Sequence, residues 1–194
     1  MATITTEPAT ITRWDDVQHS LSGGGDGRSC QCIWPIVRNK DWQATNFDER
    51  SNMLHDEIAT GPPPGLIAYI DGEAAGWIRV GPRTDQLRIV HTRSITAATT
   101  EPLDDDSVWA VTCFVVRREH RGKGLNAKLL QSAIQYARDS GARMLEAYPV
   151  DTTRGMHRVN DLFHGAVSTF LTAGFERGPA ISGGRVLVTR PLSD

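Results

Sequence analysis

The sequence has 194 residues, of which 39% are hydrophobic and 23% are charged, and its formal net charge is −2. This length and composition suit one globular domain, and the balance of charge signs argues against a protein that binds nucleic acid through a basic face. No apolar run has transmembrane length, and the start lacks the basic and apolar regions of a secretory signal, so we expect no membrane association and a cytoplasmic location.

The first 30 residues predict an N-terminal extension that precedes a single domain over residues 31–194. This extension should contain a short strand or coil, a helical turn near residues 14–21 and a glycine-rich loop at 22–27. The apolar run at 30–37 predicts a strand.

The next elements are a helix and a β-hairpin. Residues 46–60 predict a helix, because Asn or Asp can cap its start and the Gly-Pro-Pro-Pro sequence at 61–64 stops it. The apolar runs at 66–70 and 74–80 predict two strands. They are separated by Asp71-Gly72-Glu73, a turn sequence that tolerates positive φ.

The second half of the chain alternates between strands and helices. The β-branched and aromatic run at 108–116 predicts a buried strand, and the apolar spacing of residues 125–140 predicts a helix. A short strand is expected at 144–148, a second helix at 162–171 and a last strand at 185–189. We therefore predict a mixed α/β sheet in one domain.

One segment between the buried strand and its helix carries binding chemistry. It reads Arg121-Gly122-Lys123-Gly124-Leu125-Asn126. The first amides of a helix lack partners within the helix and lie at the positive end of its dipole. Glycines let the backbone approach a phosphate closely, and Arg121 adds positive charge. The segment predicts a pyrophosphate site, although glycines can also serve turn geometry alone.

Two other phosphate-binding motifs compare less well with this segment. A nucleotide triphosphate loop requires Lys-Ser or Lys-Thr after its last glycine, and no such pair occurs. The dinucleotide pattern G-x-G-x-x-A fits residues 122–127, with Glu146 about 20 residues later. Too little chain follows residue 127 for the remaining units of a doubly wound domain, so a dinucleotide-binding domain is the weaker alternative.

The segment resembles the acetyl-CoA-binding motif of the GNAT acetyltransferase superfamily, Gln/Arg-x-x-Gly-x-Gly/Ala. Asn126 stands where that motif has its final small residue. The resemblance extends from about Val108 to Phe175, and Phe170 to Phe175 is similar to the superfamily's Tyr-x-x-x-Gly-Phe motif. The hairpin at 66–80 is similar to its central antiparallel strands.

The resemblance implies a mixed, mostly antiparallel sheet with a splayed parallel pair, flanked by helices. It also implies an N-acetyltransferase that uses acetyl-CoA as co-substrate, needs no metal, and lets an amine attack the thioester directly in a ternary complex. The residues that it places at the co-substrate are Phe114 and Val116 through their main chain at pantetheine, and Arg121, Gly122, Lys123, Gly124, Leu125 and Asn126 at the pyrophosphate.

The sequence departs from the superfamily at the catalytic positions. The usual tyrosine acid is Phe170, and the strand segment 108–110, where some members have a glutamate base, contains no carboxylate. Glu146 and Tyr148 are therefore our candidate catalytic residues, although strand alternation leaves open whether Glu146 faces the cleft or has a structural role. Further candidates are Asp151, His120, His157 and His164.

Several questions stay open from the sequence. The amine acceptor is an unidentified small molecule or peptide, and the chain can act as a monomer or a homodimer. Without the usual acid and base, a catalytically inactive acyl-CoA-binding module is the main alternative to an enzyme. Cys113 is expected to be an inert buried thiol, and Cys30-x-Cys32 lacks the second half of a zinc site.

Overall fold

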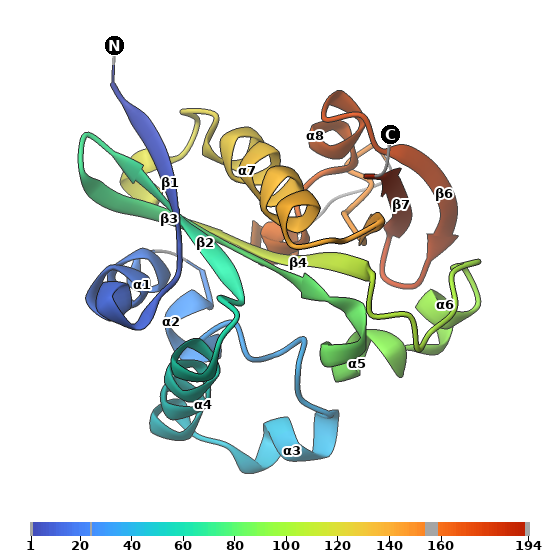
Figure 1. Ribbon diagram of the computed structural model, residues 1–194, viewed down its shortest axis with the longest axis horizontal. Helices are drawn as coiled ribbons and strands as arrows, with labels where there is room; N and C mark the ends of the chain where they lie inside the picture. Colours follow the sequence, from blue (N-terminus) through green and yellow to red (C-terminus); the bar gives the residue numbers. More distant parts are fainter. Residues whose placement is uncertain (1, 24, 154–158, 193–194) are drawn as a thin grey trace.

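The computed structural model describes residues 2–23, 25–153 and 159–192 (Figure 1). Its centre is a seven-stranded sheet of order β1-β2-β3-β4-β5-β7-β6. Neighbouring strands are antiparallel except β4 and β5, which are parallel. The strands are β1 (Ile4–Pro8), β2 (Gly65–Ile70), β3 (Glu73–Pro82), β4 (Val108–Val116), β5 (Met144–Ala147), β6 (Glu176–Ile181) and β7 (Arg185–Pro191).

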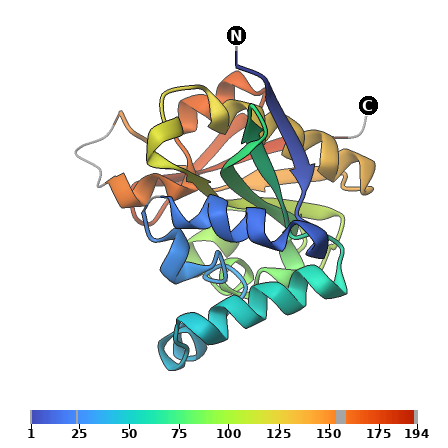
Figure 2. The ribbon, with the colours of Figure 1, turned by 90° about the vertical axis from the view of Figure 1, so that its left-hand side faces the viewer.

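Helices cover both faces of the sheet (Figures 1 and 2). On one face lie α7 (Leu125–Asp139) and α8 (Val167–Thr172), and on the other lie α1 (Trp14–Ser22), α2 (Gly27–Cys30) and α4 (Phe47–Thr60). The peripheral elements are α3 (Asn39–Ala44), α5 (Leu87–Val90), α6 (Arg93–Thr96) and the 3-10 turns η1 (Ile11–Arg13), η2 (Arg83–Asp85), η3 (Arg118–His120) and η4 (Val159–His164). Within the described ranges, no helix is both long and apolar enough to cross a bilayer.

The core divides along the two faces of the sheet. Side chains from β2 to β5 pack with Leu129, Leu130 and Ile134 of α7 on one face. On the other face, Leu54 and Trp77 belong to the cluster that α1, α2 and α4 cover. Alternation along the strands produces this division, since successive side chains point to opposite faces.

The strongest sequence signals are confirmed. The strand predicted at 108–116 has those bounds, and the predicted helix at 46–60 begins one residue later. Asn46 caps this helix: its side chain accepts from Glu49 N–H while the Glu49 carboxylate accepts from Asn46 N–H, which satisfies two helix-start donors. In the hairpin, Asp71 and Gly72 both have positive φ, as the turn requires.

Several elements differ from the sequence prediction. The strand expected at 30–37 is wrong, because Gln31 and Cys32 adopt the left-handed conformation and the segment forms α2 and turns. The helix expected at 162–171 begins only at Val167, after η4. β6 was not predicted because its side chains are mostly exposed and show no apolar alternation.

The N-terminal residues are integrated into the same fold. β1 pairs with β2 along its whole length, from Ile4 opposite Ile70 to Pro8 opposite Leu66. Val17 of α1 is fully buried against the sheet. The described part of residues 1–30, which the sequence separates as an extension, therefore contributes to the sheet and to the core.

Candidate active site

β4 has a strand neighbour on only one side over half of its length. Val108–Val111 pair in parallel with β5, which then ends, whereas β3 accompanies β4 to Val116. No described strand pairs with Thr112–Val116 on the β5 side, and we call this segment the open edge of β4. Alternate backbone groups of a strand point toward each neighbour, so an extended ligand with amide groups can pair with this edge as an added strand.

The turn after β4 leads directly into the start of α7. Gly122 and Gly124 have φ of +74° and +78°, a conformation that strains residues with a side chain. Gly124 is the N-cap of α7, and no side chain caps the helix. The first hydrogen bond into the helix runs from Lys128 N–H to Gly124 O (3.2 Å), so the amides of residues 125–127 have no acceptor within the helix. These amides can bind an anion.

Some side chains of this turn line a cavity beside it, and others point into the core or toward neighbouring residues. Asn126 lines the cavity, and its Oδ1 is buried without a hydrogen-bond partner in the part of the chain that the structure describes. Arg121 is exposed at the cavity mouth, where its Nε donates to Val116 O (3.4 Å). Leu125 packs into the core, and Lys123 lies near His120 instead, with Nζ 3.4 Å from Nδ1.

A cavity of about 950 Å³ connects this turn to the open edge of β4. Its lining includes residues 112–116 of β4 and the turn residues Arg121, Gly122, Gly124 and Asn126. Parts of the segments 25–42, 88–95 and 162–164 also contribute, together with Val150, Gly183 and Arg185. The volume lies within the range of small-molecule and cofactor sites. Six of the eight residues predicted at the co-substrate therefore line one cavity; the exceptions are Lys123 and Leu125.

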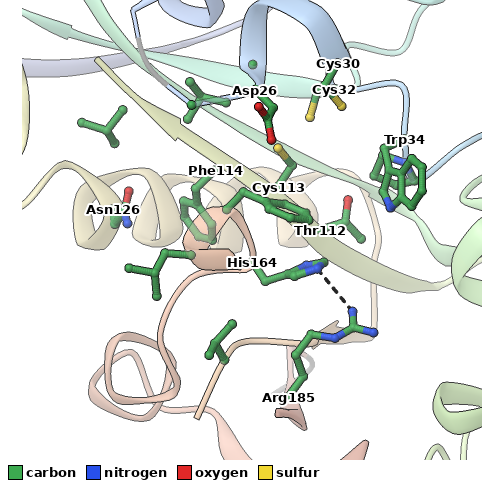
Figure 3. Close-up of a pocket in the computed structure, with 18 of the residues that line it drawn as sticks. Asp26, Cys30, Cys32, Trp34, Thr112, Cys113, Phe114, Asn126, His164 and Arg185 are labelled. Atoms are coloured by element: carbon green, nitrogen blue, oxygen red, sulfur yellow. Dashed lines mark hydrogen bonds between the residues drawn. The ribbon is translucent and has the colours of Figure 1, made fainter. Parts of the chain in front are cut away.

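His164 and Arg185 form a pair beside Thr112 and Phe114 (Figure 3). His164 Nε2 lies 3.4 Å from Arg185 Nη1. Burial, and then the charge of Arg185, lower the pKa of His164 to about 3, so the imidazole is neutral at pH 7. Burial also lowers the pKa of Arg185, whose charge is only partly screened by solvent.

The three cysteines all line the cavity, on the face of β4 that α2 covers (Figure 3). Burial raises the pKa of Cys30 to about 11. Burial alone would raise the pKa of Cys32, but a hydrogen bond with Cys113 and the charge of Arg79 lower it overall. The pKa of Cys113 is raised by the same hydrogen bond and by burial, which agrees with the expectation of an unreactive thiol.

Glu146 and Tyr148, the residues predicted to be catalytic, lie outside the cavity lining. Glu146 is fully buried: Oε1 accepts from Arg83 Nη1 (3.0 Å) and Thr99 Oγ1 (2.5 Å), and Oε2 accepts from Tyr148 OH (2.9 Å). Burial, followed by the negative charge of Glu146, raises the pKa of Tyr148 well above its ordinary value. These contacts give both residues a place in a buried ion-pair network, and a catalytic role for them stays a prediction that the geometry does not favour.

Of the other predicted candidates, His164 lines the cavity, whereas Asp151 and His120 are engaged elsewhere. Asp151 accepts from Thr153 Oγ1 (2.6 Å) and Arg177 Nη2 (2.5 Å) outside the cavity lining. His120 is buried behind the turn and near Glu73, with Nε2 3.7 Å from Oε2. His157 lies outside the described residues.

One group of potential metal ligands is close together within the described ranges. Ligand atoms of Glu73, Glu119 and His120 lie within 4.8 Å of one another, outside the cavity lining. Glu119 already has a cationic partner, since Arg117 Nη2 lies 2.6 Å from its Oε1. Both carboxylates are exposed, so nothing in this group requires a metal ion.

No motif in the sequence indicated several side chains that shape the cavity, among them Arg185. Asp26 points toward Cys113, and Trp34 stands at the opposite end of the view from Asn126 (Figure 3). Trp42 and Arg88 complete this end, where the rings of Trp34 and Trp42 meet edge to face at 5.0 Å. Their only sequence signal was composition: a glycine-rich loop and two tryptophans in a region with no motif.

Comparison with known proteins shows the family to which the chain belongs. The family model described as Acetyltransferase (GNAT) family matches residues 31–162, which is more than half of the chain. A search of curated protein sequences found no match.

Solved structures resemble the chain over nearly its whole length. A proposed acetyltransferase from Salmonella typhimurium, solved with its cofactor acetyl-CoA, has a TM-score of 0.54 at 16% identity and covers 98% of this chain and 95% of its own. A PaiA N-acetyltransferase from Thermoplasma acidophilum, solved with coenzyme A, has a TM-score of 0.54 at 14% identity, covering 97% and 99%. At these identities the likeness establishes the fold.

Proposed function

Because the chain belongs to the acetyltransferase (GNAT) family, we propose that it transfers the acetyl group of acetyl-CoA to an amine by direct attack within a ternary complex. One observation carries the proposal. A single cavity joins the unpaired amides at the start of α7 to the open edge of β4. That arrangement offers an anion site and an amide-pairing edge in one space, as a diphosphate with a pantetheine arm requires.

The residues of the cavity suit coenzyme A along its length. The amides that follow Gly124 take the pyrophosphate, and Arg121 contributes positive charge at the mouth. The pantetheine amides pair with the main chain of Phe114 and Val116. The orphaned Oδ1 of Asn126 accepts a hydrogen bond from an N–H or O–H group of the ligand. Two solved structures of the same fold contain acetyl-CoA or coenzyme A, which supports coenzyme A as the kind of ligand.

The reaction requires an amine without its extra proton. The nitrogen lone pair attacks the thioester carbonyl carbon and the C–N bond forms. The C–S bond then breaks, the nitrogen releases one proton to give the amide, and the departing thiolate takes up a proton. A backbone N–H of the open edge near Phe114 stabilises the negative oxygen of the intermediate. Alkyl ammonium groups have a pKa of about 10, so a base must accept a proton before attack.

We assign proton acceptance to Asp26, directly or through water. It is the one carboxylate among the described residues of the lining, and its side chain points into the cavity (Figure 3). His164 also lines the cavity, but its Nε2 lies 3.4 Å from Arg185 Nη1, so a proton accepted there would lie beside a positive charge. Replacement of Asp26 by Asn should lower kcat with every amine acceptor, whereas His164→Asn should keep most of the kcat.

The experiment for the proposed function combines binding and turnover. Calorimetric titration with coenzyme A should show binding that Gly124→Asp and Arg121→Glu weaken. Lys40→Glu, an exposed charge reversal on α3, is the control that should keep full affinity. Thiol release from acetyl-CoA should then depend on an added amine. Unchanged affinity in folded Gly124→Asp and Arg121→Glu proteins would refute the assignment of the turn.

One observation favours a second function, binding of acyl-CoA without transfer. Phe170 occupies the position of the family's tyrosine, is fully buried, and has no proton to donate to a leaving thiolate. A non-catalytic module should bind coenzyme A and release no thiol with any amine. The dinucleotide-binding alternative is disfavoured by the sheet, because only one of its six described strand pairings is parallel.

A further inference from the structure

The end of the cavity away from the phosphate-binding turn carries two arginines. Arg88 belongs to α5, and Arg185 is the first residue of β7. Ser94 Oγ and Ser182 Oγ lie 2.8 Å apart, which connects α6 to the turn before β7 and brings these two regions of the lining together. Figure 3 shows Arg185 on the side of Thr112 and Trp34, with Asn126 at the far side.

Arg88 is fixed in place with part of its guanidinium unpaired. Its Cζ lies 3.4 Å over the Trp34 ring, and its Nε donates to Trp34 O (2.8 Å). Its Nη2 is buried and has no hydrogen-bond partner in the part of the chain that the structure describes. The orientation is therefore set by Trp34, while a donor nitrogen stays available to a ligand.

Arg185 is held in a similar way. Its Nε donates to Ser182 O (3.3 Å), and Nη1 lies near the neutral His164. Across the described residues, neither Arg185 nor Arg88 forms an ion pair with a carboxylate. By contrast, the core arginines Arg79 and Arg83 are each paired, with Glu57 at 2.7 Å and Glu146 at 3.0 Å.

The charges of the cavity are thus unbalanced. Its described lining contains Arg88, Arg121 and Arg185 but only one carboxylate, that of Asp26. Arg121 lies at the phosphate-binding turn, so its partner is the diphosphate. Arg88 and Arg185 lie in other parts of the lining, and their planar guanidinium groups match the bidentate geometry of a carboxylate or phosphate.

We infer that the acceptor is an amine that also carries an anionic group, of the α-amino acid type, and that Arg88 and Arg185 bind this group. The inference rests on the proposed function, since it concerns the acceptor of the same reaction. Trp34, Trp42 and Ile95 supply an apolar wall for the rest of the acceptor. Polyamines are excluded as preferred acceptors, because two unpaired arginines repel additional positive charge.

The first experiment measures thiol release from acetyl-CoA with matched amines and uses the unmodified protein. The twenty L-amino acids are compared with their amides, and L-phenylalanine with phenethylamine; spermidine represents the polyamines. The preferred acid should exceed its amide in kcat/KM by about ten- to hundredfold, the range expected for charge-assisted hydrogen bonds. The comparison is stringent, because the amide's amine loses its proton more readily.

Variants then test the two arginines. Arg88→Gln and Arg185→Gln should raise KM for the preferred acid at least tenfold, leave KM for acetyl-CoA unchanged, and bring acid and amide to similar rates. Arg88→Lys should recover part of the preference, because it keeps the charge but not the planar fork. Arg93→Gln, an exposed neighbour on α6, should behave like the unmodified protein.

The outcomes separate this inference from the proposed function. Turnover that is equal or faster with amides, phenethylamine or spermidine would overturn the inference and leave the acetyltransferase intact. An acid preference that survives in folded Arg88→Gln and Arg185→Gln proteins would also overturn it. No thiol release with any amine would refute the proposed function itself, and the assignment of the acceptor with it.

Discussion

The rings of Phe114 and Phe170 meet edge to face, with centroids 5.9 Å apart and planes at 79°. Phe170 also packs against Phe175 at 5.1 Å, so an aromatic cluster connects the open edge of β4 to α8. Gly165 lies beside this cluster, where an added Cβ would come within 2.9 Å of the Phe170 ring. At this position the chain has a close-packed ring where its family has a tyrosine acid.

A tyrosine at position 170 should therefore not restore an acid. Phe170→Tyr adds a hydroxyl to a fully buried ring that does not line the cavity, and an unsatisfied buried hydroxyl costs about 1–3 kcal/mol. We expect a lower midpoint in urea denaturation and an unchanged kcat. A raised kcat with a new basic limb in the pH profile would contradict this, since it would show that the hydroxyl reaches the leaving thiolate.

Breaking the buried ion pair of Arg83 and Glu146 should lower the stability of the fold. Both side chains are fully buried, and Glu146→Gln would leave the guanidinium without a negative partner. We expect a loss of about 3–5 kcal/mol in the free energy of unfolding, measured with urea. The double variant Arg83→Met with Glu146→Leu should recover much of it, because no buried charge then stays unpaired.

An exposed pair provides the control for this prediction. Arg13 and Glu7 lie 3.2 Å apart with partly exposed side chains, so Glu7→Gln should cost less than about 1 kcal/mol. If Glu146→Gln were as mild as Glu7→Gln but abolished turnover, Glu146 would be a functional residue, as the sequence first suggested.

The fold could be predicted where local signals and burial agree. The strand at 108–116 is apolar except at Thr112 and is buried on both faces, and residues 125–139 show one clear apolar helix face. The segment 30–37 is also largely apolar, yet it forms α2 and turns. The strand prediction failed there because a run of buried apolar side chains does not distinguish a strand from a compact loop. The left-handed Gln31 and Cys32 leave no trace in composition.

The site could be predicted only where one short segment contains it. The phosphate-binding turn is contiguous, so its glycines and helix start were visible in the sequence. The partner of Glu146 is 63 residues away, and Trp34 is fixed to Arg88 across 54 residues. Such pairs arise from topology, and no spacing in one sequence indicates them.

Stability should depend on pH through His164. Burial, then the charge of Arg185, lower its folded-state pKa to about 3 from an ordinary value near 6.5, so the unfolded chain binds more protons between these values. The free energy of unfolding therefore carries no penalty from His164 above pH 6.5. It decreases as the pH falls toward 3, by at most about 1.4 kcal/mol per pH unit. His164→Asn should flatten urea-derived stability between pH 6 and 4. His91→Asn, an exposed control, should keep the slope; equal slopes in all three proteins would contradict the prediction.

Gly124 and Gly72 offer a matched test of the phosphate-binding turn. Both have positive φ (+78° and +88°), and an added Cβ would meet no atom within 4 Å at either position. Gly124→Ala and Gly72→Ala should therefore each lower the free energy of unfolding by a similar amount, about 1–2 kcal/mol, because of backbone strain alone. Only Gly124→Ala should also weaken coenzyme A binding in calorimetry, because its Cβ and the shifted backbone disturb the amides at the start of α7. If both variants bound coenzyme A equally well, these amides would not hold the diphosphate, since the hairpin turn at Gly72 lies outside the cavity lining.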